Sequence, residues 1–185
     1  RNNGFDKKEN FVVFECVCRL LSKGYRPEHI ELEKEWHLGH DAKGGRADIC
    51  VSDTSGNMLF IIECKTWGRE YDKALNNTKS DGAQLFSYWQ QEQSCKWLVL
   101  YASDLRSGCI AYKAPTIDCS DDANIILLSK KDKSIKLYRD AHTTSAKYEA
   151  WKETYGSQIH DDLIFSEDSV AYQIGVKPLR KKDLR

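Results

Sequence analysis

The chain has 185 residues, of which 41% are hydrophobic and 30% charged, a composition that excludes an intrinsically disordered chain and predicts one folded domain. No apolar run approaches the roughly 18 residues needed to span a bilayer, and residues 1–10 lack a signal-peptide pattern, which argues against a membrane or secreted protein. The 28 basic residues balance 28 acidic ones, so any surface that binds nucleic acid must be local.

The seven cysteines are odd in number, and most of them lie inside apolar runs. Disulfide frameworks are typical of small secreted proteins with an even count, so these cysteines are expected to be free thiols in a cytoplasmic protein. Cys16 and Cys18 form a C-x-C pair, but no second pair of cysteines or histidines follows at the spacing of a zinc site. They are interpreted as small hydrophobic residues.

The first part of the chain predicts a helix and a β-hairpin. Residues 9–22 are apolar on nearly all sides and end before Gly24, which predicts a buried helix. Residues 31–38 alternate and predict a strand, and a glycine-rich loop then leads to a short apolar strand at 47–53. The apolar run 58–65 predicts a further strand after a Ser-Gly-Asn turn, so these last two strands should pair antiparallel in the middle of a sheet.

The second part predicts one more helix and three more strands. Residues 66–80 are polar with no clear apolar period and are predicted to be a loop. Residues 81–93 predict a helix with one apolar face. Strands are predicted at 96–103, 108–114 and 124–129.

This order of elements predicts a single α/β domain with a mixed central β-sheet flanked by α-helices. We place the domain at residues 1–160, with a last helix at 145–155. The chain begins with Arg1 rather than Met, and residues 161–185 show no stop signal, so we expect a C-terminal extension or connector to a further domain.

Two charged residues interrupt the apolar strand at 58–65. Because side chains alternate along a strand, Glu63 and Lys65 point to the same face, and the hairpin can bring Asp48 beside Glu63. Buried charges are costly unless they are paired, so this group needs an explanation. Two carboxylates and a lysine suit hydrolysis of a phosphodiester, because carboxylates bind Mg²⁺ or Mn²⁺ and a lysine can orient or deprotonate the attacking water.

These residues resemble the motif of the PD-(D/E)xK nuclease superfamily. The chain reads Gly-Arg-Ala-Asp48 and then Ile-Glu63-Cys64-Lys65, with Ala47 in place of the usual proline. The resemblance implies that Asp48, Glu63 and Lys65 are catalytic. It also implies that Asp48, Glu63 and the backbone carbonyl of Cys64 bind the metal ion.

A second motif, Gln84-x-x-x-Tyr88, puts two polar side chains on one side of the helix after the catalytic strand. The same element accompanies the nuclease motif in the N-terminal domains of type I restriction motor subunits, and the order of elements over about residues 8–130 resembles the HsdR N-terminal family. The resemblance implies that Gln84 and Tyr88 contact DNA, and Arg69 is a further candidate. The alternative is that Tyr88 belongs to the core and Gln84 is merely exposed.

Glu15 lies in the middle of the predicted first helix. A glutamate from that helix reaches the metal site in many nucleases of this kind, so the resemblance implies Glu15 as a further metal ligand. The alternative is a surface ion pair with Arg19, four residues further along the helix.

The expected function is therefore that of a Mg²⁺-dependent endonuclease domain, with Mn²⁺ able to substitute, that acts on double-stranded DNA as part of a restriction enzyme. The resemblance implies further domains, such as a methyltransferase or a helicase, in the same protein or complex. One alternative is an inactive nuclease fold that binds nucleic acid or holds a complex together. Another is a structural domain in which the Glu63–Lys65 pair is incidental, although the complete set with Asp48 favours an enzyme.

Overall fold

The computed structural model describes residues 8–36 and 45–119, together with residues 146, 148, 149, 152, 159 and 160. The helices and strands, in chain order, are α1 (Lys8–Ser22), the 3-10 turn η1 (Pro27–His29), β1 (Ile30–Glu35), β2 (Arg46–Ser52), β3 (Met58–Cys64), α2 (Arg69–Asp81), α3 (Ala83–Trp89), β4 (Trp97–Arg106), β5 (Cys109–Lys113), β6 (Thr116–Asp118) and β7 (Ile159–His160).

The strands form one mixed sheet in the order β1-β2-β3-β4-β6-β7, with β5 paired to the far part of β4 outside that order. Among the described strands, only β3 and β4 pair in parallel, and α2 and α3 lie between them in the chain. The pairs β1–β2, β2–β3, β4–β5, β4–β6 and β6–β7 are antiparallel. The predicted α/β fold with a mixed central sheet is confirmed.

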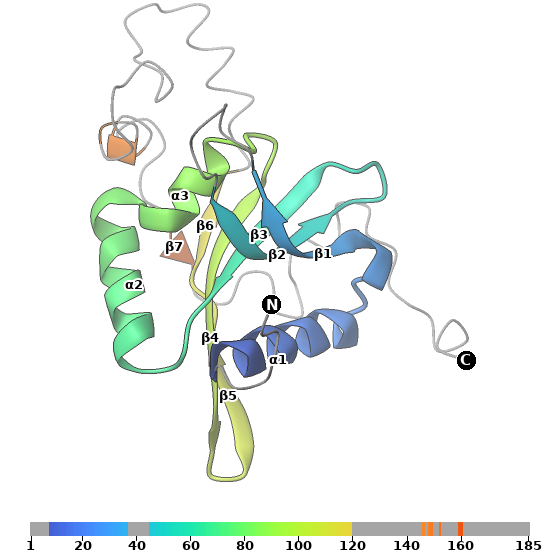
Figure 1. The fold of residues 1–185 in the computed structure, drawn as a ribbon, viewed down its shortest axis with the longest axis vertical. Coiled ribbons are helices and arrows are strands. Elements are labelled where there is room, and N and C mark those ends of the chain that lie inside the picture. Colours follow the sequence, from blue (N-terminus) through green and yellow to red (C-terminus); the bar gives the residue numbers. More distant parts are fainter. Residues whose placement is uncertain are drawn as a thin grey trace, which may run out of the picture.

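Helices cover both faces of this sheet, with α1 on one side and α2 and α3 on the other (Figure 1). All seven residues of β3 are buried, and from Phe60 to Cys64 they alternate between the two faces. Phe60, Ile62 and Cys64 join the core under α1. Ile61 joins the core under α3. Glu63 has the same parity as Ile61, so its carboxylate lies on the α2–α3 side.

The β2–β3 hairpin, predicted from its sequence, is confirmed with Ile49 opposite Ile62. Its turn is held by the carboxylate of Asp53, which accepts hydrogen bonds from the backbone N–H groups of Ser55 and Asn57 at 2.8 and 2.9 Å. Gly56 has a φ of 85°, a conformation that glycine adopts without steric cost. The turn therefore fixes the register of the two central strands.

The prediction of a loop at 66–80 is wrong, because α2 fills most of this segment. Its inner face consists of Tyr71 and Thr78, which are buried, and of Ala74 and Leu75, which pack against the core. This is a helical spacing, but its composition is too polar to stand out as an apolar period. Gly82, with a φ of 73°, ends α2 and separates it from α3, so the single helix predicted at 81–93 is shorter than expected.

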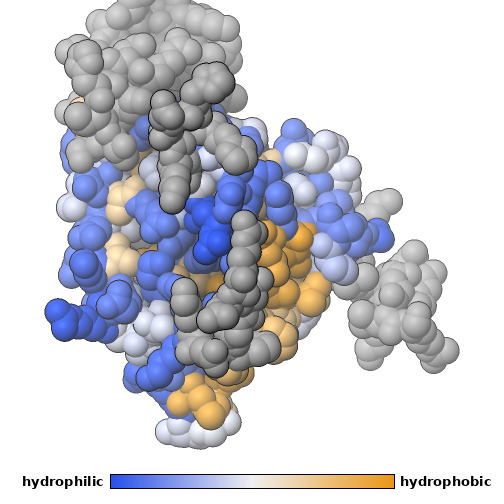
Figure 2. Space-filling model, in the orientation of Figure 1, coloured by the Kyte–Doolittle hydropathy of each residue, from blue (hydrophilic) through white to orange (hydrophobic). Residues whose placement is uncertain are grey.

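The first helix is confirmed, but it is not buried on all sides. Its inner row is Val12, Cys16 and Leu20, whereas Phe11 and Phe14 are 55% and 59% exposed. Further exposed apolar residues lie on the β4–β5 hairpin, whose free end carries hydrophobic surface (Figure 2).

The C-terminal predictions are only partly covered by the structure. Residues 146, 148, 149 and 152 are helical, in line with the helix predicted at 145–155. The predicted strand at 124–129 and the extension at 161–185 lie outside the described residues. The short strands β6 and β7 were not predicted from the sequence.

Candidate functional site

The predicted catalytic residues meet where β2 and β3 lie side by side. Continuing the register of the hairpin by one residue places Asp48 opposite Glu63. The Asp48 carboxylate accepts a hydrogen bond from the backbone N–H of Cys64 at 2.8 Å. Lys65 follows β3 directly, and its ammonium lies 2.5 Å from the Glu63 carboxylate. The structure therefore brings Asp48, Glu63 and Lys65 into one cluster, which we call the acid–lysine cluster.

A residue of α1 reaches this cluster, but it is not the one that the sequence suggested. The Lys65 ammonium lies 3.2 Å from a carboxylate oxygen of Glu9, in the first turn of α1. Glu15 instead accepts hydrogen bonds from Arg19, at 2.5 Å, and from the hydroxyl of Tyr101. The alternative considered for Glu15, an ion pair with Arg19, is the one that the structure contains. Sequence reasoning missed Glu9, since an acidic residue in a first helical turn is ordinary.

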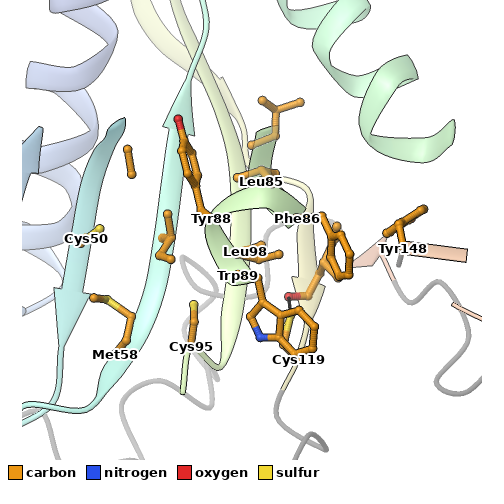
Figure 3. Close-up of a cluster of buried hydrophobic side chains, with 14 of the residues drawn as sticks. Cys50, Met58, Leu85, Phe86, Tyr88, Trp89, Cys95, Leu98, Cys119 and Tyr148 are labelled. Atoms are coloured by element: carbon orange, nitrogen blue, oxygen red, sulfur yellow. Dashed lines mark hydrogen bonds between the residues drawn. The ribbon is translucent and has the colours of Figure 1, made fainter. Parts of the chain in front are cut away.

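Tyr88 of α3 holds Glu63 from the other side. Its hydroxyl lies 3.0 Å from the second carboxylate oxygen of Glu63 and 2.5 Å from the backbone carbonyl of Arg46. It also accepts a hydrogen bond from the side-chain amide of Gln84. Figure 3 shows Tyr88 rising from α3 with its hydroxyl turned away from Trp89. The two residues of the Gln-x-x-x-Tyr motif are thus linked to the carboxylate of Glu63, with Gln84 contacting Tyr88 and Tyr88 contacting Glu63.

The ring of Tyr88 is enclosed by its neighbours. It stacks on Trp36, with the ring centroids 5.5 Å apart, and its exposed fraction is 0%. A Cβ atom added to Gly45 would lie 2.5 Å from the ring, so only glycine leaves room for it. Tyr88 belongs to the core, and direct contact with DNA, the role predicted for it, does not fit this burial. Gln84 is exposed.

Burial governs the electrostatics of the acid–lysine cluster. Burial, with the negative charge of Asp48 next, raises the pKa of Glu63 to about 7. Burial also raises the pKa of Asp48, against the opposing effect of its hydrogen bond from Cys64. Burial alone would lower the pKa of Lys65, but Glu63, Glu9 and Asp48 outweigh it and leave that pKa above its usual value. The positive charge of Lys65 therefore does not fully compensate the two carboxylates of the cluster.

The cluster opens into a hollow of about 310 Å³ between the sheet and the helices α2 and α3. Its lining includes Glu63 and Lys65 from the cluster and Gln84 from α3. The rest of the wall comes mainly from α2, namely Glu70, Lys73, Ala74, Asn77 and Thr78. A substrate can therefore approach the cluster from this side.

The model of one protein family matches the chain from residue 9 to residue 114. That family is described as the N terminus of the type I restriction enzyme R protein (HSDR_N), and the match covers more than half of the 185 residues. The chain belongs to this family. The predicted resemblance to it is thereby confirmed. No curated protein gave a significant match.

The matched part of this HSDR_N chain contains the whole acid–lysine cluster, together with Glu9, Gln84 and Tyr88. It lies inside the domain predicted at residues 1–160. Within the described residues, no group of three or more His, Cys, Asp and Glu side chains is arranged to hold a metal ion. Arg69, the remaining candidate for DNA contact, is exposed as the first residue of α2 and does not line the hollow. None of the described helices is long and apolar enough to cross a membrane.

Proposed function

We propose that this HSDR_N chain is a metal-dependent endonuclease domain that hydrolyses phosphodiester bonds of double-stranded DNA within a restriction enzyme. The observation that carries the proposal is the cluster of two carboxylates, the half-buried Asp48 and the buried Glu63, with Lys65 beside an open hollow that Glu63 and Lys65 line. A purely structural ion pair needs one acid and one base. The second carboxylate adds repulsion that a purely structural pair does not need.

The donor set of the cluster fits Mg²⁺, and Mn²⁺ as its substitute. Mg²⁺ prefers oxygen ligands and is commonly held by one or two carboxylates while it keeps several waters. Asp48, Glu63 and the backbone carbonyl of Cys64 supply such oxygens, so a cluster of three or more side chains is not required. When bound, the ion would stabilise the negative charge that develops on the phosphate and on the leaving oxygen.

Lys65 is the residue that would orient the attacking water. Its ammonium is ion-paired to Glu63 at 2.5 Å and to Glu9 at 3.2 Å, which favours the charged form. Of the two roles considered for it, orienting the water therefore suits it better than deprotonating the water. Its positive charge can also offset negative charge that develops on the phosphate. Glu9 is a positioning residue here, because it acts on the reaction only through Lys65.

Tyr88 and Gln84, the two residues of the Gln-x-x-x-Tyr motif, have different roles. Tyr88 positions the Glu63 carboxylate and is too deeply buried to reach a substrate. Gln84 is exposed at the hollow, so it is the member of the pair that can contact DNA. Sequence recognition, DNA translocation and methylation would then belong to further domains, such as a helicase or a methyltransferase, in the same protein or complex.

Cleavage of supercoiled plasmid DNA by the 185-residue chain tests the proposal. We expect nicking and linearisation with Mg²⁺ or Mn²⁺, none with EDTA, and loss of both in Asp48→Ala and Lys65→Ala. Matched controls are Asp72→Ala and Lys79→Ala, which change exposed residues of α2 outside the lining of the hollow. Cleavage that persists in Asp48→Ala and Lys65→Ala would refute the proposed site.

Calorimetric titration with Mn²⁺ separates the proposal from its alternatives. A nuclease should bind Mn²⁺, and Asp48→Ala should abolish the binding. An inactive module that only binds nucleic acid would bind DNA without cleaving it in any metal. A structural domain with an incidental ion pair would bind neither Mn²⁺ nor DNA.

A further inference from the structure

The wall of the hollow opposite the sheet is one face of α2, a helix that the sequence did not predict. Glu70, Lys73 and Asn77 follow each other at three and four residues, so they lie on the same side of the helix. Ala74 and Thr78 lie below them against the core. Seen from outside, the surface over α2 is mainly hydrophilic (Figure 2).

Two polar side chains of this wall, those of Lys73 and Asn77, make no polar contact with the described residues. Lys73 forms no ion pair with any residue that the structure describes. The side-chain amide of Asn77 makes no hydrogen bond to the described residues either. Both side chains are exposed. Their absence would thus cost the folded domain little, and their place beside the acid–lysine cluster points to a ligand.

The charge of the hollow indicates what that ligand needs. The hollow is lined by the carboxylates of Glu63 and Glu70, Asp48 lies behind Glu63 on β2, and Lys65 is ion-paired with Glu63 and Glu9. A phosphate that enters the hollow would meet like charge, and binding to nucleic acid depends on cations that neutralise phosphates. Among the residues that line this hollow, Lys73 is the cation that remains available.

We propose that Lys73 and Asn77 bind a backbone phosphate of the DNA strand next to the bond that is cut. The Lys73 ammonium neutralises the phosphate, and the Asn77 amide donates a hydrogen bond to one of its oxygens. The exposed carboxylate of Glu70 lies one turn before Lys73 and opposes this binding, so the phosphate sits toward the Asn77 end of the wall. The inference rests on the proposed function in taking DNA as the ligand, and it adds the contact that holds the strand.

Salt-dependent binding tests this wall directly. Fluorescence anisotropy would follow the 185-residue chain and a labelled duplex of 30 base pairs, with Ca²⁺ in place of Mg²⁺ so that no strand is cut. Loss of one phosphate contact reduces the slope of log K against log salt by about 1. We therefore expect Lys73→Ala to lower that slope by about 1 and to weaken binding by about threefold to tenfold at low salt. Asn77→Ala should weaken binding at an unchanged slope, and Glu70→Gln should tighten it.

Lys79→Ala is the matched control, because Lys79 is an exposed lysine of the same helix that does not line the hollow. It should leave the slope unchanged and change the affinity by no more than about twofold. Equal losses in Lys73→Ala and Lys79→Ala, or none in either, would overturn the proposal, as would the absence of binding by the wild-type chain. Calorimetric Mn²⁺ binding should be intact in Lys73→Ala. The two proposals can therefore fail separately. The salt dependence of Lys73→Ala tests the phosphate contact, and Mn²⁺ binding by Asp48→Ala tests the metal site.

Discussion

Replacing Glu63 with glutamine should stabilise the domain in the absence of metal. The amide has the shape of the carboxylate, and its oxygen can still accept the hydrogen bond from Tyr88. The change removes the negative charge of a residue that is only 4% exposed and lies beside Asp48. Glu63, a residue of the proposed active site, would then be less favourable to folding than its neutral replacement.

The size and sign of the effect follow from the pKa of Glu63. That pKa rises from 4.5 to about 7 on folding, so the contribution of Glu63 to stability is fully present below about pH 4.5 and is lost as the pH rises through about 7. Each pKa unit corresponds to about 1.4 kcal/mol, so charging Glu63 costs up to about 3 kcal/mol at pH 8. The loss of one partner of Lys65 offsets part of this cost. We therefore expect Glu63→Gln to raise the free energy of unfolding by about 1–3 kcal/mol at pH 8.

Urea unfolding in EDTA at pH 5 and pH 8 measures this difference. Glu63→Gln should exceed the wild type in free energy of unfolding at pH 8, and the difference should shrink toward pH 5. Glu70→Gln, which neutralises an exposed carboxylate of the same hollow, should stay within about 0.5 kcal/mol of the wild type. A Glu63→Gln protein that is less stable than wild type at pH 8, or a gain that does not vary with pH, would refute the electrostatic reasoning.

Three further predictions concern the supports of the site. Tyr88→Phe keeps the ring and loses the hydroxyl that holds Glu63, so Mn²⁺ affinity by calorimetry and cleavage rate should each fall about 10–100-fold; unchanged values would remove Tyr88 from the site. Glu9→Gln should slow plasmid cleavage severalfold, because Lys65 loses a partner. Glu15→Gln should leave cleavage unchanged and lower the free energy of unfolding by about 1 kcal/mol. Slower cleavage by Glu15→Gln and normal cleavage by Glu9→Gln would restore Glu15 as the functional glutamate. Gly82→Ala should lower the free energy of unfolding in urea by about 2 kcal/mol or more, because its Cβ would lie 2.5 Å from Phe86 and Tyr148 at a φ of 73°. Gly56→Ala, at a φ of 85° with open space around it, should lower it by about 1 kcal/mol. Equal losses in the two variants would contradict the packing around Gly82.

The centre of the fold could be predicted because β3 is buried on both faces. A strand of that kind is apolar throughout, so Glu63 stands out as a charge in the wrong place. The turn between β2 and β3 then fixes which residue of β2 lies opposite it. Local rules are enough here, since every step is a contact within one hairpin.

The surroundings of the cluster could not be predicted in the same way. The buried face of α2 uses Tyr71 and Thr78 with small residues between them, which does not read as an apolar stripe. The choice between Glu9 and Glu15 depends on where α1 crosses the end of β3, a tertiary contact that helix periodicity does not contain. The burial of Tyr88 likewise depends on Trp36 and Gly45, which come from a different part of the chain.

The single-turnover rate of DNA cleavage tests the central claim most directly. A labelled duplex in excess enzyme with Mg²⁺ should be cut by the wild-type chain and by Lys79→Ala at the same rate. Removing one electrostatic catalytic group typically costs about 10²–10³ in rate, so Lys65→Ala should be slower by that factor. Cleavage by Lys65→Ala at the wild-type rate, or cleavage by the wild type in EDTA, would contradict the assignment of the acid–lysine cluster as a metal-dependent nuclease site.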